Sequence, residues 1–215
     1  MTAMDDTPLT RRTQAERRAE TRRRVLDAAT SLVAQHGSSA VSLAAVGEAA
    51  GYSRGIVNHH FGSKARLLEE LIRHTQQFDV PADSATGLGC LTQFVAAYLG
   101  GMHDRSPRSE AFLKMWTESA NLEPSLASLF AERDAAFRDY LAQQIRAGVG
   151  DGSIDPDVEP DLAALAIIGL LRGTAMMAFS TARDVSATDL SAEVARRVER
   201  SLAARQGEQV IPRKK

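Results

Sequence analysis

The stretch over residues 41–64, VSLAAVGEAAGYSRGIVNHHFGSK, constrains the fold more than any other part of the chain. Ser42 can cap a short helix that begins at Leu43, and Gly51 follows that helix at a position where a positive φ is usually required. A second capping serine, Ser53, opens another short segment. Two short helices that meet at a glycine turn have the requirements of a helix-turn-helix.

The two short helices are expected to cross closely, and Gly47 lies on the predicted inner face of the first. A residue larger than Ala at this position would push the two backbones apart. The small core of the unit is expected from Val46, Ala50, Tyr52, Val57 and Phe61. In such a unit the second helix enters the major groove of DNA, and its exposed side chains reach base edges.

Apolar residues recur at helical spacing along most of the remaining chain. Helices are predicted over 21–36 and 63–78, and then over 91–102, 109–121, 125–149, 161–181 and 190–205. No segment of the length of a strand alternates apolar and polar residues cleanly. We therefore expect an all-α fold: an N-terminal three-helix helix-turn-helix domain, followed by a C-terminal helical domain.

Residues 79–89 have the composition of a boundary between two domains, with Pro81, Asp83, Ser84, Gly87 and Gly89. We expect a disordered arm over 1–13 and a DNA-binding domain over 14–78, which includes the linking helix over 63–78. A second, helical domain is expected over 88–206. Residues 207–215 are expected to be a disordered tail.

Positive charge is concentrated near the N-terminus, although the formal net charge of the chain is only −1. Residues 11–66 hold ten basic groups against four acidic ones, a local charge of +6 that leaves −7 on the rest. A basic end on an acidic body suggests that this end faces a polyanion. We expect phosphate or minor-groove contacts from Arg11, Arg12, Arg17, Arg18, Arg22, Arg23 and Arg24. A solvated helix face is the alternative.

The sequence disfavours several classes of protein. The single cysteine, Cys90, cannot form an internal disulfide, and the N-terminus has no secretory signal, so we expect a cytoplasmic protein. The apolar run over 162–171 is about half of the ~20 residues that a membrane span needs, and Arg172 interrupts it. No catalytic motif is recognised, so neither enzyme activity nor a cofactor is expected. His59 and His60 point about 100° apart on a helix and are not expected to bind a metal.

The segment LAAVGEAAGYSRGIVNHHFGSKARLLEEL, behind an arginine-rich helix that ends in QHG, closely resembles the N-terminal domain of the TetR family of bacterial repressors. The resemblance covers roughly residues 21–72. The turn glycine, the Ser-Arg-Gly opening, the His-Phe pair and Ser63, Lys64 and Leu67 fall at the family spacing. The later segment AFLKMWTESANLEPSLASL resembles the choline-responsive BetI-type branch of this family. The resemblance implies that the helical domain over 88–206 is an effector-binding and dimerisation domain.

The resemblance implies a set of DNA contacts. Ser42 and Lys64 are assigned to phosphate, each at a helix N-terminus that favours an anion. The complete DNA-binding set is expected to be Arg22, Ser42, Ser53, Arg54, Gly55, Ile56, Asn58, His59 and Lys64. Within it, Gly55 allows close approach of the backbone. For Ser42 and Ser63 the alternative is a role as helix caps alone.

Asn58 departs from the family pattern, in which an aromatic residue, commonly Tyr, stands at this position. The resemblance therefore does not imply the phosphate contact of that phenol for Asn58. Asn58 can instead reach a base edge, because Asn is a bidentate partner for adenine. His60, beside Phe61, is expected to pack in the core rather than to contact DNA.

The last two predicted helices are expected to form a dimer interface. The run over 162–171 is apolar around its whole circumference, so it must be covered on more than one side. The helix over 190–205 has an apolar stripe of its own. The expected interface residues are Leu162, Leu165, Leu170, Leu190, Val194, Val198 and Leu202. The alternative is that both stripes pack within one chain.

Aromatic and methionine side chains of the second domain are candidates for an effector pocket, although such residues are often plain core. The candidates are Phe94, Tyr98, Met102, Phe112, Met115, Trp116, Phe137, Tyr140, Arg172, Met176 and Met177. Arg172 is flanked by apolar residues and is costly to bury unpaired, so we expect a carboxylate partner in the protein or on the effector. Trp116 can equally close a cage around a cation.

These predictions together favour a homodimeric repressor that occupies a palindromic operator in double-stranded DNA and is released by a small-molecule effector. The alternatives are a non-specific architectural DNA-binding protein and a helical ligand-binding protein or enzyme. The helix over 63–78 is expected to be the only continuous rigid link between the DNA-binding domain and the body. A tilt of this helix would then move the two reading helices apart.

Overall fold

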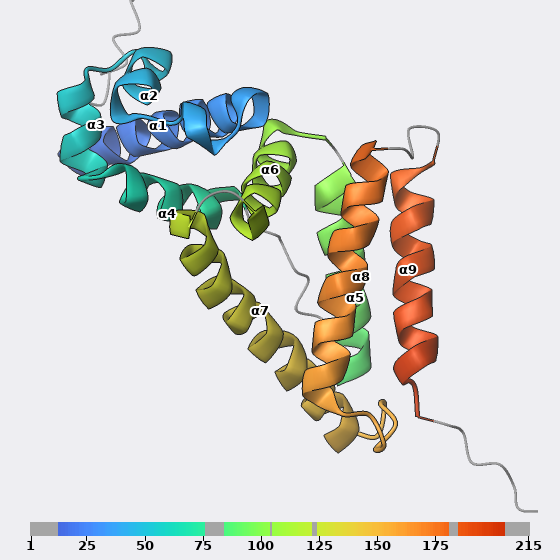
Figure 1. The fold of residues 1–215 in the computed structure, drawn as a ribbon. Helices are drawn as coiled ribbons and strands as arrows, with labels where there is room; N and C mark the ends of the chain where they lie inside the picture. Colours follow the sequence, from blue (N-terminus) through green and yellow to red (C-terminus); the bar gives the residue numbers. More distant parts are fainter. Residues whose placement is uncertain (1–12, 76–83, 104, 122–123, 181–184, 205–215) are drawn as a thin grey trace, which may run out of the picture.

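The computed structural model describes residues 13–75, 84–103, 105–121, 124–180 and 185–204. Within them the fold is all-α, as predicted (Figure 1). The elements are α1 (Gln14–His36), the short 3-10 helix η1 (Ser38–Ala40), α2 (Leu43–Ala50), α3 (Arg54–Phe61), α4 (Lys64–Thr75), α5 (Gly87–His103), α6 (Pro107–Asn121), α7 (Pro124–Gly150), α8 (Pro160–Ser180) and α9 (Ala187–Leu202). The expectations for residues 1–12, for 76–83 and for the tail lie outside the described residues.

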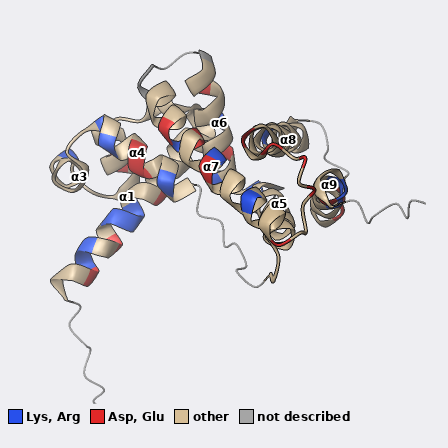
Figure 2. Cartoon of the chain, turned by 90° about the horizontal axis from the view of Figure 1, so that it is seen from below, with Lys and Arg blue, Asp and Glu red and all other residues tan. Residues whose placement is uncertain are grey.

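Helix α1 begins seven residues earlier than the apolar pattern predicts. A reciprocal capping box starts it: the Thr13 hydroxyl accepts from the Glu16 N–H at 3.2 Å, and the Glu16 carboxylate accepts from the Thr13 N–H at 2.7 Å. The buried face of the helix begins only at Val25. Its first turns therefore project from the molecule with basic side chains along them (Figure 2).

Helices α2 and α3 form the predicted helix-turn-helix. Ser42 and Ser53 cap the two helices, and Gly51 ends α2 with φ 75°, in the left-handed region. Gly47 is more constrained than expected, because a Cβ there would lie 2.8 Å from the carbonyl oxygen of Tyr52. Even Ala would force the turn to shift. The core side chains Val46, Ala50, Val57 and Phe61 are buried, and Tyr52 packs against them.

Helices α1 to α4 make one end of the molecule, and helices α5, α7, α8 and α9 make the other (Figure 1). In the second group α5 packs against α7, α8 and α9, and α7 packs against α8. Helix α6 lies between the two groups and contacts α1, α4 and α7. We call α1 to α4 the head and α5 to α9 the body.

The head and body are joined by more than the predicted linking helix. Helix α4 contacts α6 and α7, but the contacts of α6 with α1 are more extensive. Lys114 of α6 donates to the carbonyl oxygens of Ala34 and Gln35 at the end of α1. Two elements, α4 and α6, therefore connect the body to the head, which corrects the expectation of a single rigid link.

Helix α8 is long and apolar enough to cross a membrane, judged by length and composition alone. In the structure one side of it is buried within the chain, at Ala164, Ile167, Ile168, Leu171, Arg172, Ala175 and Ala178. The other side carries exposed apolar residues, with exposed fractions of 69% for Leu162, 58% for Leu165 and 57% for Met177. Helix α8 is thus a core helix of the protomer with one uncovered apolar stripe.

Candidate DNA-binding and effector sites

The exposed face of α3 carries most of the predicted reading residues. Val57 and Phe61 are the buried residues of this eight-residue helix and anchor it to the head. Arg54, Gly55, Ile56, Asn58 and His59 are all exposed, and Ile56 has an exposed fraction of 40%. An exposed Ile among polar residues is suited to contact with a thymine methyl group. The structure therefore brings the predicted base-reading residues together on one surface.

The predicted phosphate contacts lie at three helix N-termini. The hydroxyl of Ser42 accepts from the N–H of Ala45 at 3.0 Å, and that of Ser53 accepts from the N–H of Ile56 at 3.3 Å. Ser63 caps α4 in the same way, and Lys64 is the exposed first residue of that helix. Each serine hydroxyl oxygen accepts the capping hydrogen bond, and its O–H can still donate to a phosphate, so capping and phosphate binding are compatible.

Arg22 has a structural role that the sequence did not predict. It forms an ion pair with Glu70 of α4, and its guanidinium lies over the Phe61 ring at 5.5 Å from the centroid. Arg24 lies over the Tyr52 ring in the same manner, at 5.4 Å. These two arginines fasten α1 to the helix-turn-helix. Some arginines of the run, Arg22 and Arg24, therefore pack against the helix-turn-helix, and the others that the structure describes form an exposed basic face.

His60 is half-buried rather than a core residue. Burial lowers the pKa of its imidazole, and the neighbouring charges of His59, Arg18 and Arg22 lower it further. These effects favour the neutral form of the side chain. Its position beside the arginines of α1 places it at the edge of the reading surface.

The predicted effector-pocket residues separate into distinct groups. Phe94, Tyr98, Phe137 and Tyr140 pack on one another, with ring centroids 5.4 to 6.2 Å apart. Phe112 packs instead against Phe130. Met115 is fully buried, Met176 is half-buried, and Met177 is exposed. A cavity beside Met102 measures about 10 Å³, which holds at most one water.

Arg172 has the carboxylate partner that its burial requires. Its Nη1 donates to Asp134 Oδ2 at 2.6 Å, and its Nη2 donates to the second carboxylate oxygen. The guanidinium also lies over the Trp116 ring at 5.0 Å. A cation of the protein itself therefore covers the face of Trp116 where the predicted cage would hold a cationic ligand. Nearby, burial raises the pKa of Tyr98 to about 12.

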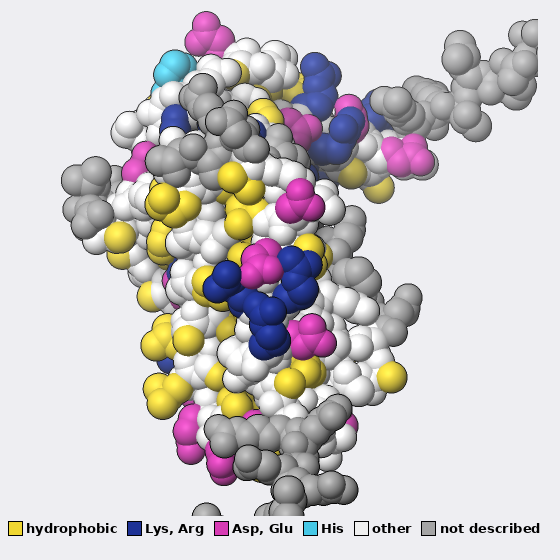
Figure 3. All heavy atoms as spheres, turned by 90° about the vertical axis from the view of Figure 1, so that its right-hand side faces the viewer, with side chains coloured by type: hydrophobic (Ala, Val, Ile, Leu, Met, Phe, Trp, Pro, Cys, Tyr) yellow, Lys and Arg dark blue, Asp and Glu magenta, His cyan; other side chains and the backbone are white. Residues whose placement is uncertain are grey.

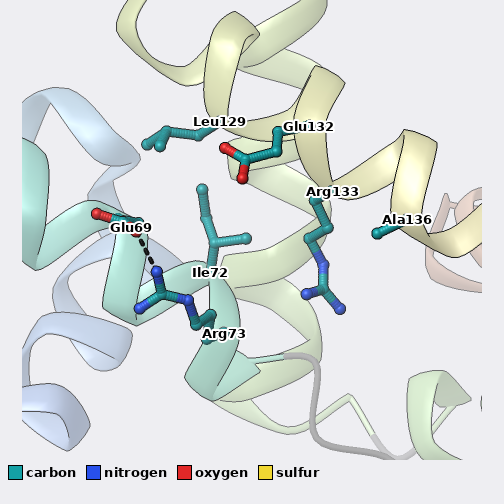
Figure 4. Close-up of a pocket in the computed structure, with 7 residues that line it drawn as sticks. All are labelled: Glu69, Ile72, Arg73, Leu129, Glu132, Arg133 and Ala136. Atoms are coloured by element: carbon teal, nitrogen blue, oxygen red, sulfur yellow. Dashed lines mark hydrogen bonds and ion pairs between the residues drawn. The ribbon is translucent and has the colours of Figure 1, made fainter.

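A larger cavity lies between α4 and α7, where the sequence did not predict one. It measures about 240 Å³ and is lined by Glu69, Ile72, Arg73, Leu129, Glu132, Arg133 and Ala136 (Figure 4). Four of these seven side chains are charged, and in the sequence they look like solvated helix faces. Only the tertiary packing of α4 against α7 makes them the walls of one site.

The predicted interface residues do not share one surface. Leu162, Leu165 and Leu170 are exposed on α8, but Val194, Val198 and Leu202 are buried within the chain and Leu190 is half-buried. Helix α9 uses its apolar stripe against α5 of the same chain. Its outer face instead carries Glu193 with three arginine partners, Arg196, Arg197 and Arg200 (Figure 3). The α9 stripe is thus corrected to protomer core.

Comparison with known families decides what this architecture is. Residues 25–71 match the family described as bacterial regulatory proteins, tetR family, and residues 90–203 match the BetI-type transcriptional repressor, C-terminal. The second match covers more than half of the chain. The chain belongs to the TetR family. It is accordingly a helix-turn-helix transcriptional regulator, and the resemblance noted in its sequence is confirmed.

Individual members of the family match this chain over most of its length. The HTH-type transcriptional regulator UidR of Escherichia coli K12 is 23% identical over 178 residues, which cover 80% of this chain and 85% of UidR. A TetR-family regulator from Rhodococcus sp. has the same fold, with a TM-score of 0.74 at 19% identity over 86% of this chain and all of that one. A regulator from Saccharomonospora viridis, solved in complex with choline, has a TM-score of 0.70 at 24% identity over 87% and 100% of the two chains.

Proposed function

We propose that this regulator is a homodimeric cytoplasmic repressor that reads a palindromic operator with α3 and leaves it when a small molecule binds the body. The observation that carries the proposal is the surface of α3, where two buried anchors leave Arg54, Ile56, Asn58 and His59 exposed on one short helix. A helix of this kind fits the major groove of DNA, which is about 12 Å wide.

Each exposed residue of the reading surface has a proposed role. Asn58 and His59 contact base edges, with Asn58 suited to adenine, and Arg54 is suited to guanine. Ile56 contacts thymine methyl groups, and Gly55 lets the α3 backbone approach the DNA. Phosphates on either side are bound by Ser42, Ser53 and Lys64 at the N-termini of α2, α3 and α4.

Dimerisation is proposed through the uncovered stripe of α8, which includes Leu162, Leu165, Leu170 and Met177. These residues are exposed in the isolated chain, and a contiguous exposed apolar stripe on a soluble protein marks an interaction surface. Symmetry adds a second argument, because a palindrome has two half-sites and needs two reading helices. The proposed functional units are a DNA-binding domain over 14–78 and an effector-binding and dimerisation domain over 88–206.

Competition binding tests this function directly. A labelled palindromic fragment selected by the protein is challenged with unlabelled copies of itself and with random DNA of equal length, at fixed salt. The proposal expects specific binding to exceed random binding by roughly 10³-fold or more. Equal competition by the two DNAs would favour the alternative, an architectural protein that binds DNA through its basic end without sequence preference.

A further inference from the structure

We propose that the cavity between α4 and α7 is the effector site and that it takes a small organic carboxylate, with Arg133 as the partner of the ligand's anionic group. The inference rests on the proposed function and supplies the chemical class of its effector. The cavity was not part of the pocket expected from the sequence, which drew on aromatic and methionine residues of the body.

The cavity combines an apolar wall with charged edges. Ile72 of α4 and Leu129 and Ala136 of α7 supply the apolar part (Figure 4). The volume of about 240 Å³ lies below the roughly 300 to 1,000 Å³ that pockets for drug-sized ligands occupy. The shape therefore suits a compact ligand with a short hydrocarbon body and one polar end.

Arg133 is the lining cation that forms no ion pair with a described residue; the adjacent Asp134 carboxylate attracts its charge but is hydrogen-bonded to Arg172. Arg73, on the opposite wall, forms an ion pair with Glu69 of its own helix, and Arg172 of α8 is paired with Asp134. The Nε–H of Arg133 is buried and donates to no protein acceptor, and Figure 4 shows its guanidinium turned away from Glu132. This half-buried guanidinium can bind a carboxylate through two parallel hydrogen bonds.

The charges in the cavity favour an anionic ligand over a cationic one. Burial lowers the pKa of Arg133, which means that its charge has lost part of its hydration and that an anion would compensate the loss. Glu69 is already paired with Arg73, and Glu132 is exposed to solvent. The carboxylates available for a cationic ligand are therefore neutralised or well hydrated, whereas Arg133 is neither.

The position of the cavity gives a ligand direct access to the head. Ile72 and Arg73 lie on α4, which follows the reading helix, while Arg133 lies on α7 of the body. A ligand that bridges the two walls favours the spacing of α4 and α7 that it fits best. Only this differential affinity can shift the position of the head. Arg133 also precedes Asp134, which holds Arg172 over Trp116, so binding is expected to change the fluorescence of the single tryptophan.

The test uses the full-length protein without DNA and probes of matched shape. Butyrate, hexanoate, octanoate and phenylacetate are titrated while Trp116 fluorescence and thermal unfolding are followed, with hexanamide and hexylammonium as uncharged and cationic controls. At least one carboxylate is expected to bind at least tenfold more tightly than hexanamide, a difference of about 1.4 kcal/mol. Failure of all four to bind at concentrations on the order of 10 mM, or equal binding of the amide, would overturn the proposal.

Two variants with a matched control locate the site. Arg133→Gln is expected to weaken carboxylate binding at least tenfold, whereas Arg138→Gln, on the exposed side of the same helix, is expected to bind like the unaltered protein. Glu132→Gln removes a negative charge beside the anionic ligand and is expected to tighten binding. A misfolded variant would bind more weakly, so tighter binding cannot result from misfolding. Unchanged affinity in both Arg133→Gln and Glu132→Gln would place the carboxylate elsewhere.

Operator binding separates this proposal from the one on which it rests. The bound carboxylate is expected to lower operator affinity about 5- to 150-fold in the unaltered protein and to have no effect on Arg133→Gln. Carboxylate binding without any operator binding would contradict the repressor function and leave the site intact. Operator affinity that stays the same when the carboxylate is bound would contradict the effector role of the cavity.

Discussion

Glu118 of α6 accepts a hydrogen bond from the main-chain N–H of Ser38 at 3.0 Å, and this contact joins the body to the head just beyond the end of α1. Lys114, one turn earlier on α6, donates to the Gln35 carbonyl at 3.1 Å. A cation at a helix C-terminus also interacts favourably with the helix dipole. Helix α6 thus binds the end of α1 through two charged side chains. A movement of the body can therefore be transmitted to the head through α6 as well as through α4.

Gly37 tests the importance of the α6 contact. Its φ of 82° disfavours any side chain, and a Cβ would lie 2.4 Å from the Glu118 carboxylate. Gly62 has a similar φ of 75° with open space around it. Gly62→Ala is therefore expected to lower the free energy of unfolding by roughly 1 to 2 kcal/mol. Gly37→Ala is expected to cost at least about 1 kcal/mol more, because its ψ of 174° lies in a region that is essentially restricted to Gly and because Ala also displaces a charge-assisted hydrogen bond. Urea denaturation of both variants measures the difference.

A double-mutant cycle checks the cause of that difference. If the extra cost comes from Glu118, it disappears when Gly37→Ala is made in an Glu118→Ala background. A cost that persists there would assign it to the backbone of Gly37 alone.

The ion pair between Arg172 and Asp134 predicts unequal effects for its two partners. The Arg172 side chain has an exposed fraction of 8% and that of Asp134 has 32%. Asp134→Ala leaves a buried, unpaired guanidinium and is expected to cost roughly 3 kcal/mol of stability. Arg172→Met leaves a carboxylate that water can reach, so it is expected to cost less. Equal losses in thermal or urea unfolding would show that the pair is not buried in the way described.

Lys64→Ala tests the proposed phosphate contact at the start of α4. The variant is expected to bind all DNA sequences more weakly by a similar factor and to lower the slope of log affinity against log salt by about one unit. Arg138→Ala, on the body, serves as the control for loss of one positive charge. An unchanged slope for Lys64→Ala, measured by titration over a range of salt concentrations, would remove this residue from the interface.

The stripe of α8 predicts the oligomeric state. Leu165→Glu places a charge in the middle of the proposed interface and is expected to give a monomer, with operator affinity falling because the half-sites are no longer bound together. Ile56→Glu is the matched control: it changes an exposed apolar residue on α3, so it is expected to remain dimeric while losing DNA binding. Light scattering that finds Leu165→Glu as a soluble dimer would place the interface elsewhere.

The parts of the structure that depend on local chemistry could be predicted from the sequence. Ser42, Ser53 and Gly51 act within a few residues of their own positions, and the structure has them as the expected caps and turn. The need of Arg172 for a carboxylate also follows from its apolar neighbours. The early start of α1 was missed because the buried face of the helix begins only at Val25, although the capping box of Thr13 and Glu16 could have indicated it.

The parts that depend on packing between distant segments could not be predicted. Periodicity shows that the stripe of α9 is buried but not whether its partner belongs to the same chain, and Val198 packs within its own chain. The cavity between α4 and α7 joins Arg73 and Arg133, which are 60 positions apart in the sequence. Nothing local distinguishes these arginines from the other charges on solvated helix faces.

The central claim is that α3 reads DNA sequence on behalf of a symmetric dimer, and selection from a randomised DNA library tests it most directly. The unaltered protein and the Asn58→Ala and His59→Ala variants are selected in parallel. The account predicts an enriched inverted repeat whose half-sites lie about one helical turn, ~34 Å, or a multiple of it apart. Each variant is expected to change the preferred base at corresponding positions in both half-sites, at a cost of roughly 1 to 3 kcal/mol. Enrichment of no inverted repeat, or the same preferences in all three proteins, would contradict it.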